Sequence, residues 1–298
     1  MDKVAVIYNP NSGKKKLSGL IDTITAELRE GFQEVTVYQT EKGGDAALFV
    51  NEIAESVDCI IAAGGDGTVN EVVNALSVID KRPALAIIPG GTSNDFSRSI
   101  GMFQNPLKAT SQLLEKNVAE IDVGKADNSY FLNFWGIGLV TEVALSVDAE
   151  AKDSFGQLAY YIRTAQTMGQ VKPFQLQIES SSFQFNEEVV MLIVGNGMFT
   201  GGVNAFFPKG NIQDGMLDVL IIKETSVQAF WSMLQSKLVK EPTVDEGIIS
   251  FQTDQLTITT SPNQPIDCDG EQRDYTPSKI KVLPKHIKMI VGNIEVKA

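Results

Sequence analysis

The stretch Cys59–Thr68, which reads CIIAAGGDGT, decides the fold. Its first five residues carry no charge, and a glycine-rich turn with a single aspartate follows at once. A short apolar run of this kind is typical of a strand that is buried on both faces, as strands of parallel sheets are. The stretch therefore predicts a parallel α/β sheet with a glycine loop at the carboxyl end of a buried strand.

Strand and helix patterns alternate around this stretch. Further strands are predicted at Lys3–Tyr8, Glu34–Tyr38 and Ala84–Ile88, and helices at Leu17–Arg29, Asp45–Ser56 and Val69–Leu76. Such alternation predicts a parallel sheet with helices on both faces. Ligands of sheets of this type bind beyond the carboxyl ends of the strands.

The pattern changes after residue 122, where the predicted strands become longer and more closely spaced. They are Tyr130–Trp135, Phe174–Glu179, Glu188–Val194, Leu217–Ile222, Ile248–Phe251, Leu256–Thr260 and Ile280–Leu283, interrupted by helical patterns at Phe155–Met168 and Val227–Leu238. We therefore expect an α/β domain over residues 1–122 and a mostly antiparallel, β-rich domain over residues 123–286. The C-terminal segment, residues 287–298, is a candidate to return to the first domain and pack with it.

Three glycine-rich loops follow three of the predicted parallel strands. They are Asn9–Lys14 (NPNSGK), Gly64–Thr68 (GGDGT) and Pro89–Asp95 (PGGTSND). All three are expected at the same edge of the sheet, where glycines let backbone N–H groups approach an anion. The pattern predicts a polyphosphate cradle, and it matches neither GxxxxGK[ST] nor GxGxxG.

One of these loops contains an aspartate, which places a negative charge inside an anion cradle. The arrangement is unfavourable unless a cation mediates, so we expect Asp66 to hold Mg²⁺ directly or through water. Asp95 and Asp122 are candidates for additional anchors of the same ion.

Three carboxylates near the C-terminus are candidates for a general base. Asp267, Asp269 and Glu271 occupy alternate positions and would share one face if the chain stays extended there. Clustered carboxylates raise one another's pKa, which suits a base. The alternative is a hairpin turn, because Asp-Gly is a strong turn pair.

Composition excludes some classes of function. The net charge of −12 over 298 residues is unlike that of a nucleic-acid-binding protein, and it argues against broad adhesion to anionic membranes. Local basic clusters remain at Lys14–Lys16 and at Lys279, Lys281, Lys285 and Lys288, for which solvated faces are the alternative. Two cysteines suggest neither a disulfide framework nor a zinc site. No stretch resembles a signal peptide or a membrane span, so we expect a cytoplasmic protein.

The loop sequences NPNSG, GGDGTVNE and PGGTSND, at this spacing, resemble the diacylglycerol kinase catalytic domain family, in its soluble bacterial lipid kinase branch. The similarity continues through Asp122, Gly195-Asn196, Asp214–Asp218 and Asp269–Glu271, so it covers nearly the whole chain. This resemblance implies an NAD-kinase-like α/β domain that binds nucleotide, followed by a β-sandwich-like domain that binds the lipid acceptor.

The resemblance also implies ATP and Mg²⁺ as cofactors and a set of site residues. Nucleotide contacts are implied for Asn9, Asn11, Ser12, Gly13, Thr40, Gly64, Gly65, Asp66, Gly67, Thr68, Val69, Asn70 and Thr92. A structural Mg²⁺ is implied at Asn211, Asp214 and Met216, held partly by backbone carbonyls. The proton acceptor is implied in the Asp-Gly-Glu segment, and we favour Glu271 with Asp269 in support and Asp66 as the third catalytic residue.

The expected function is the ATP-dependent phosphorylation of a hydroxyl of diacylglycerol or a related lipid, with transient, peripheral contact to a membrane. Alternatives are another lipid alcohol (a sphingoid base, a monoacylglycerol, phosphatidylglycerol or a polyprenol), an NAD kinase, and a non-catalytic nucleotide-binding regulator. The helix around 157–163 and the loop Gly197–Phe207, with Phe199, Phe206 and Phe207, are candidates for an acyl groove, and ordinary core is the alternative. The sequence leaves the oligomeric state open.

Overall fold

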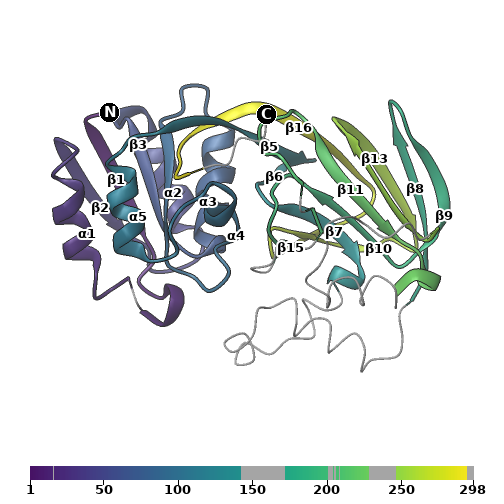
Figure 1. Ribbon diagram of the computed structural model, residues 1–298. Coiled ribbons are helices and arrows are strands. Elements are labelled where there is room, and N and C mark those ends of the chain that lie inside the picture. The colour runs from purple at the N-terminus through teal and green to yellow at the C-terminus, as the bar shows by residue number, and fades with distance from the viewer. Residues whose placement is uncertain are drawn as a thin grey trace. The chain divides into compact units, whose positions relative to one another are not determined.

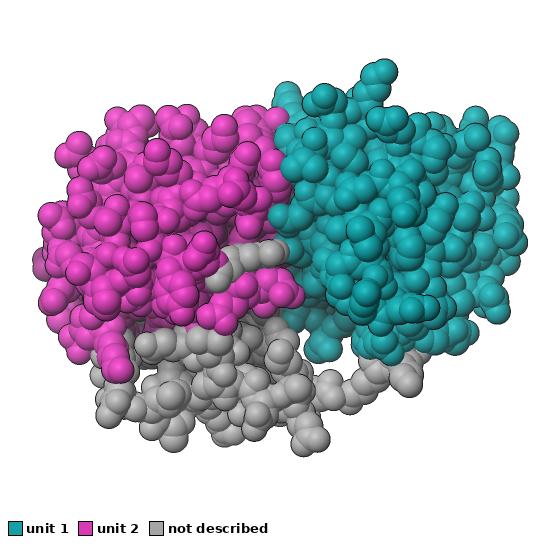
Figure 2. Space-filling model, turned by 180° about the vertical axis from the view of Figure 1, so that it is seen from behind, with its two compact units in different colours: residues 1–122, 285–298 teal, residues 123–284 magenta. Residues whose placement is uncertain are grey.

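The computed structural model describes residues 1–15, 17–141, 172–200, 204, 206–207, 209–227 and 246–293. Two compact units divide the chain: unit 1 is Met1–Asp122 with Lys285–Ala298, and unit 2 is Val123–Pro284 (Figure 2). The chain passes between the units in two strands, β5 (Val118–Ala126) and β16 (Ser278–Ile290).

A parallel sheet forms the centre of unit 1 (Figure 1). Its strands are β1 (Lys3–Tyr8), β2 (Glu34–Gln39), β3 (Cys59–Gly64) and β4 (Ala84–Pro89), in the order β2-β1-β3-β4, and all pairs are parallel. Every residue of β3 and β4 is buried, in agreement with their apolar sequences, whereas the edge strand β2 is largely exposed. Met289 of β16 pairs with Leu85 of β4 in the parallel direction. The predicted parallel α/β fold is confirmed.

The helices of unit 1 pack on this sheet. They are α1 (Ile21–Leu28), α2 (Asp45–Ile53), α3 (Asp66–Ser77), α4 (Asp95–Ser99) and α5 (Pro106–Leu113), with short 3₁₀ turns at Ser12–Lys15 and Ala54–Ser56. Helix α1 packs against α5, and α2 packs against α3. Helix α3 begins at Asp66, three residues before the predicted start at Val69, and an acidic residue in the first turn is favourable to the helix dipole. The carboxyl end of β3 therefore leads through Gly65 directly into the N-terminus of α3.

Unit 2 consists of antiparallel strands in two sheets. Besides parts of β5 and β16, they are β6 (Ser129–Phe131), β7 (Phe134–Gly138), β8 (Phe174–Ser180), β9 (Gln184–Val189), β10 (Met191–Gly195), β11 (Leu217–Ile222), β12 (Ile248–Thr253), β13 (Gln255–Ser261), β14 (Pro265–Cys268) and β15 (Glu271–Tyr275). One sheet has the order β16-β13-β8-β9, with β5 paired to β16 and β6 paired to β5, and the other has the order β12-β11-β10-β7-β14-β15.

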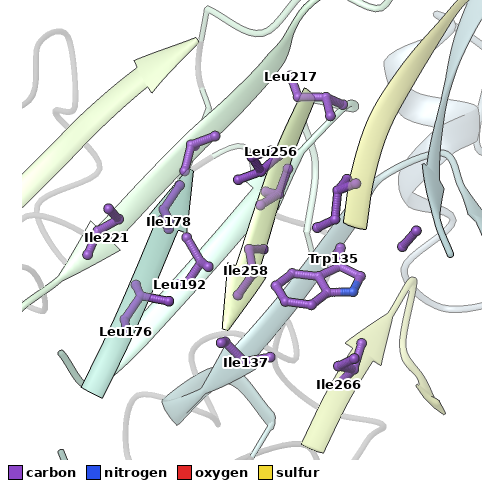
Figure 3. Close-up of a cluster of buried hydrophobic side chains, with 14 of the residues drawn as sticks. Trp135, Ile137, Leu176, Ile178, Leu192, Leu217, Ile221, Leu256, Ile258 and Ile266 are labelled. Carbon is purple, nitrogen blue, oxygen red and sulfur yellow. The ribbon is translucent and has the colours of Figure 1, made fainter. Parts of the chain in front are cut away.

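Side chains from both sheets form the core of unit 2 (Figure 3). Trp135 and Leu192 come from one sheet, and Leu176 and Ile258 come from the other; each is fully buried. Burial of a side chain of this size stabilises the fold by about 1.5–3 kcal/mol. Two packed antiparallel sheets confirm the predicted β-sandwich-like architecture.

Two predicted strands are each split in the structure. Residues 130–135 are divided between β6 and β7, with a break at Leu132-Asn133, and residues 188–194 are divided between β9 and β10 at Val190. At the first break, the backbone N–H groups bond to a side chain and not to a neighbouring strand. The predicted helix Phe155–Met168 and nearly all of Val227–Leu238 lie outside the described residues. Among the helices that the structure describes, none has the length and apolar character needed to cross a membrane.

Candidate active site

The three glycine loops of unit 1 are hydrogen-bonded neighbours. They follow β1, β3 and β4, and all three leave the carboxyl edge of the sheet. The Gly90 N–H donates to the Gly64 carbonyl oxygen at 2.7 Å, and the Asn9 N–H donates to the Ala63 carbonyl oxygen at 3.0 Å. The loops therefore form one connected surface.

Close backbone packing explains the glycines at two positions of this surface. Gly13 has a φ of +53°, and a Cβ atom there would lie 1.9 Å from the Gly90 carbonyl oxygen. A Cβ atom on Gly91 would lie 2.7 Å from the Cα atom of Gly65. A larger residue at either position would push two loops apart, so the glycines allow the loops to pack this closely.

Asp66 joins two of the loops through its carboxylate. Its Oδ2 accepts a hydrogen bond from the Asn94 N–H at 2.9 Å, and its Oδ1 accepts one from the Asp95 N–H at 2.8 Å. Burial raises the pKa of Asp66, whereas these two N–H donors and the charge of Arg98 oppose the increase. A carboxylate oxygen is a ligand that a hard cation such as Mg²⁺ prefers. Asp66 therefore has a structural role, because its carboxylate joins the loops that follow β3 and β4.

Asn94 is a site residue that the sequence analysis did not select. It has a left-handed backbone with a φ of 49°. Its side-chain oxygen accepts the Gly91 N–H at 2.8 Å, and its amide donates to the Gly91 carbonyl oxygen at 2.9 Å. Asparagine after a Gly-Gly turn is a usable sequence signal for this geometry, because asparagine tolerates left-handed backbone and bonds locally.

A cavity of about 240 Å³ opens beside the loops. Five residues with implied nucleotide contacts line it: Asn9, Asn11, Thr40, Gly67 and Thr68. Cavities that enclose a whole drug-sized ligand have volumes of about 300–1,000 Å³, so this cavity has the size for part of a nucleotide.

Local hydrogen bonds fix the polar lining of this cavity. The Asn9 amide donates to the Thr68 hydroxyl at 3.3 Å, and the Asn9 side-chain oxygen accepts the Asn11 N–H at 2.9 Å. The Thr40 N–H donates to the Tyr8 carbonyl oxygen at 3.0 Å, which continues the pairing of β1 and β2 by one residue. Hydrogen bonds within the chain therefore position the polar side chains of the lining.

The remaining residues with implied nucleotide contacts do not line the cavity. They are Ser12, Gly13, Gly64, Gly65, Asp66, Val69, Asn70 and Thr92. The Ser12 hydroxyl accepts the Gly65 N–H at 3.2 Å, Val69 and Asn70 are buried in α3, and Thr92 is exposed. Glu41, Lys42, Gly43, Ala46 and Glu71 also line the cavity. The sequence analysis did not select these residues, although Glu41 and Lys42 follow Thr40 directly at the same sheet edge.

The Asp-Gly-Glu segment of unit 2 forms a hairpin turn between β14 and β15. Asp269 and Gly270 both have positive φ, 54° and 85°, and Cys268 pairs with Glu271. A two-residue loop with two positive φ values is a type I′ turn. The expectation that Asp267, Asp269 and Glu271 share one face is therefore wrong, because the chain reverses at Asp269.

The Asp269 carboxylate anchors this turn to the break between β6 and β7. Its Oδ2 accepts the Leu132 N–H at 2.7 Å, and its Oδ1 accepts the N–H groups of Asn133 and Phe134, both at 2.9 Å. The Asp269 N–H in turn donates to the Phe134 carbonyl oxygen at 3.0 Å. Both oxygens of Asp269 are therefore used by backbone donors.

The two other carboxylates of the hairpin have different surroundings. Glu271 is exposed, and no hydrogen bond to another described residue holds its carboxylate. Asp267 is buried, and its Oδ1 accepts the Gly270 N–H at 2.8 Å. Burial raises the pKa of Asp267 to about 6; the Gly270 N–H opposes this shift, and the negative charge of Glu271 adds to it.

The residues that the family resemblance implies as ligands of a structural metal lie in the loop before β11. The Asn211 side-chain oxygen accepts the Gln213 N–H, and the Asp214 carboxylate accepts the Met216 N–H, both at 3.0 Å. In the described part of the chain, no group of three or more His, Cys, Asp or Glu side chains is arranged to hold a metal. Asp214 is the only carboxylate of the implied set. An ion at this loop would thus depend on amide and carbonyl oxygens as well, which Ca²⁺ and Mg²⁺ accept.

A second apolar cluster lies on the opposite face of the β7–β10–β11 sheet from the main core. Strand β10 shows the alternation: Leu192 belongs to the main core, and Met191 and Ile193 belong to the second cluster. Phe207 is buried in this cluster and Phe206 packs against it. This placement favours the core alternative for Phe207, and the helix expected around 157–163 lies outside the described residues.

Comparison with known proteins gives two family matches. Residues 3–126 match the diacylglycerol kinase catalytic domain, and residues 136–291 match the YegS C-terminal NAD kinase beta sandwich-like domain. A diacylglycerol kinase of Bacillus subtilis (strain 168) is 32% identical over 293 residues, which cover 98% of this chain and 97% of that protein.

The solved structures include a crystal structure of a diacylglycerol kinase from Bacillus anthracis str. Sterne, with a TM-score of 0.87 and 36% identity. The match covers 99% of each chain. The fold, the connected glycine loops and these full-length similarities agree, and the chain belongs to the diacylglycerol kinase-like lipid kinase family.

Proposed function

We propose that this protein transfers the γ-phosphate of ATP to a hydroxyl of diacylglycerol or a closely related lipid, with the help of Mg²⁺. Membership of the lipid kinase family supports the reaction class. The observation that carries the proposal is the cavity beside the three glycine loops, because its polar lining is positioned by hydrogen bonds within the chain. In this proposal unit 1 binds the nucleotide and unit 2 binds the lipid acceptor.

The cavity residues hold and orient the nucleotide. Asn9 and Thr68 present amide and hydroxyl groups whose positions are fixed by their mutual hydrogen bond. In this proposal the phosphates would lie near the N-terminus of α3, where the helix dipole favours negative charge. Positioning of this kind is the main contribution that a protein makes to phosphoryl transfer.

Asp66 is the proposed anchor for the catalytic metal, with Asp95 and Asp122 as further candidates. When bound, Mg²⁺ neutralises charge on the phosphate oxygens. Asp95 and Asp122 are both buried, and the Asp122 Oδ1 accepts the Lys285 N–H at 2.7 Å. In unit 2, Asn211, Asp214 and Met216 remain the proposed ligands of a structural ion.

Glu271 is the proposed proton acceptor. The lipid hydroxyl oxygen forms a bond to the γ-phosphorus, the bond from that phosphorus to the β–γ bridging oxygen breaks, and ADP leaves. The hydroxyl proton passes to the Glu271 carboxylate. Glu271 fits this role better than Asp269, because three backbone N–H groups use the oxygens of Asp269, whereas no N–H group of the described residues bonds to those of Glu271.

The experiment is transfer of labelled γ-phosphate to a panel of acceptors in neutral mixed micelles. The panel contains diacylglycerol, monoacylglycerol, a sphingoid base, phosphatidylglycerol, a polyprenol and NAD. We expect transfer to diacylglycerol that requires Mg²⁺ and is lost in Glu271→Gln. Preference for another lipid corrects the acceptor, transfer to NAD alone contradicts the lipid assignment, and transfer to none of them contradicts the proposed activity.

A further inference from the structure

Asp267 is a buried carboxylate that the proposed reaction does not use. It lies in β14 between Ile266 and Cys268, whose side chains belong to the main core of unit 2, so Asp267 faces the opposite side of the sheet. On that side it pairs with Gly136, and Gly136 pairs in turn with Ile193 of the second apolar cluster. The carboxylate therefore has apolar neighbours across the sheet, which screen its charge far less than water does.

The charge of Asp267 has no neutralising partner in the described part of the chain. Its Oδ1 accepts the Gly270 N–H at 2.8 Å, and no described lysine, arginine or histidine forms a salt bridge with it. Burial raises the pKa of Asp267 to about 6, so the side chain is still largely ionised at neutral pH. An asparagine would accept the same N–H without burying a charge. The hydrogen bond alone therefore does not explain why a carboxylate stands here.

The proposed proton acceptor, Glu271, lies within electrostatic range of this carboxylate. The two residues flank the same two-residue turn, because Glu271 pairs with Cys268 and Asp267 precedes Cys268. The negative charge of Glu271 adds to the increase in the pKa of Asp267, so the two carboxylates interact. In the proposed reaction the phosphate is transferred to the hydroxyl whose proton Glu271 accepts. An anionic group beside that hydroxyl would therefore also come within range of Asp267.

We propose that Asp267 is a charge filter of the acceptor site: its carboxylate repels lipids that carry an anionic group next to the accepting hydroxyl. The filter restricts the acceptor to lipids with an uncharged head, because like charges in weakly screened surroundings repel strongly. The same repulsion acts on the phosphorylated product, whose phosphate carries a charge of about −1.5 to −2, and favours its release. This inference rests on the proposed function, since it requires a lipid hydroxyl beside Glu271.

The test compares two acceptors that differ by one methyl group, which removes the charge. They are phosphatidylglycerol, with its phosphodiester anion, and the uncharged phosphate methyl ester of the same lipid. Transfer of labelled γ-phosphate in neutral mixed micelles at pH 8 gives the ratio of kcat/KM for the uncharged acceptor to kcat/KM for the anionic one. We expect a ratio of at least about ten in the wild type and of about one in Asp267→Asn. Asp274→Asn removes an exposed carboxylate of β15 and should keep the wild-type ratio.

The pH dependence of this ratio tests the charge itself. Between pH 8 and pH 5 the phosphodiester stays ionised, whereas Asp267 becomes mostly protonated, because its pKa is about 6. The wild-type ratio should therefore fall as the pH falls through about 6, and the ratio for Asp267→Asn should stay constant. Titration of ATP affects both acceptors equally and cancels in the ratio. Thermal melting checks the fold of Asp267→Asn, which keeps an oxygen for the Gly270 N–H.

A binding measurement separates this proposal from the proposed reaction. Calorimetry without ATP, using short-chain forms of the two lipids, should show phosphatidylglycerol binding at least about tenfold more tightly to Asp267→Asn than to the wild type, and the methyl ester binding equally to both. Equal binding of phosphatidylglycerol to both proteins, or an equal change in Asp274→Asn, overturns the filter even if diacylglycerol is phosphorylated. Absence of transfer to every lipid, with this binding difference intact, overturns the proposed reaction and supports the filter.

Discussion

The carboxylate of Asp269 accepts a hydrogen bond from the backbone N–H of Asn133 at 2.9 Å, across 136 positions of sequence. The same carboxylate accepts the N–H groups of Leu132 and Phe134. A single side chain thus fixes the break between β6 and β7 and the hairpin that carries Glu271. Within the Asp-Gly-Glu segment, Asp269 thus positions the turn, and Glu271 stays exposed, which its proposed role as proton acceptor requires.

Asp269→Ala should strongly destabilise unit 2. The change leaves three backbone N–H groups without their acceptor, and each unsatisfied buried donor costs about 1–3 kcal/mol. We expect the free energy of unfolding to fall by at least about 3 kcal/mol, measured by chemical denaturation. The exposed Glu271→Ala is the matched control and should change it by no more than about 0.5 kcal/mol. Equal stability of the two variants would contradict the anchoring role.

Glu271→Gln should lower kcat and leave nucleotide binding nearly unchanged. The substitution keeps the shape and removes the basic oxygen, and general-base catalysis contributes roughly 10²–10⁴-fold. We expect kcat to fall within that range while the KM for ATP stays constant, because Glu271 does not line the nucleotide cavity. Unimpaired lipid phosphorylation by this variant would move the search for the base to Asp66 or Asp122.

Asp66→Ala should remove activity and also reduce stability. The carboxylate is a proposed metal anchor, and it also binds the N–H groups of Asn94 and Asp95. We expect kcat/KM to fall by more than tenfold, which corresponds to a transition-state change above ~1.4 kcal/mol. We expect unfolding free energy to fall by about 1–3 kcal/mol. Asp66→Asn keeps one oxygen acceptor and should recover part of the stability but not the activity; recovery of both would exclude the metal role.

Asp267 should make the protein less stable as pH rises between about 4 and 6. Its folded pKa of about 6 lies above the ordinary value of ~3.9, so the folded state binds this proton more tightly than the unfolded state does. The stabilising contribution is present below pH ~4 and is lost as pH passes the folded pKa.

Asp267→Asn should remove this dependence, because asparagine stays neutral and keeps an oxygen for the Gly270 N–H. At pH 7 the variant should be more stable than the wild type by on the order of 2–3 kcal/mol. The measurement is the difference in unfolding free energy between wild type and variant at pH 4, 5, 6 and 7, since other acids titrate equally in both. A difference that does not change with pH would show that Asp267 titrates normally.

Mg²⁺ should stabilise the wild type against heat more than it stabilises Asp214→Ala. An ion that binds only the folded state adds about 2.7 kcal/mol at 100 times its dissociation constant. Thermal melting with and without Mg²⁺ measures the effect, and Asp274→Ala, at an exposed carboxylate outside this loop, serves as the control. Identical Mg²⁺ shifts in all three proteins would contradict an ion at the loop before β11.

The local sequence pattern predicts the positions of many strands and helices. The bounds predicted for Lys3–Tyr8 and Leu217–Ile222 are those of β1 and β11. The shared edge of the glycine loops follows from parallel strands alone. The break at Leu132-Asn133 was not predictable in this way, because its cause is a carboxylate far along the chain.

Side-chain roles are less accessible to sequence reasoning than element positions. Alternation placed three acids on one face, but a type I′ turn redirects Asp269. Similarly, the strand predicted at Ile280–Leu283 is only part of the thirteen-residue β16. The prediction was too short because polar residues such as Lys285 and His286 interrupt the apolar pattern.

The route of the chain through β5 and β16 has a consequence for biosynthesis. Unit 1 is interrupted by all of unit 2, and its sheet gains Met289 beside Leu85 only from the far end of the sequence. The Arg82 guanidinium likewise donates to the His286 carbonyl oxygen at 3.0 Å. On the ribosome, the first 122 residues emerge long before these partners. One edge of β4 therefore stays unpaired while unit 2 is translated. The nascent chain therefore depends on its last strand to cover that edge. Although unit 1 begins the sequence, all strand residues of unit 2 are synthesised before unit 1 is complete.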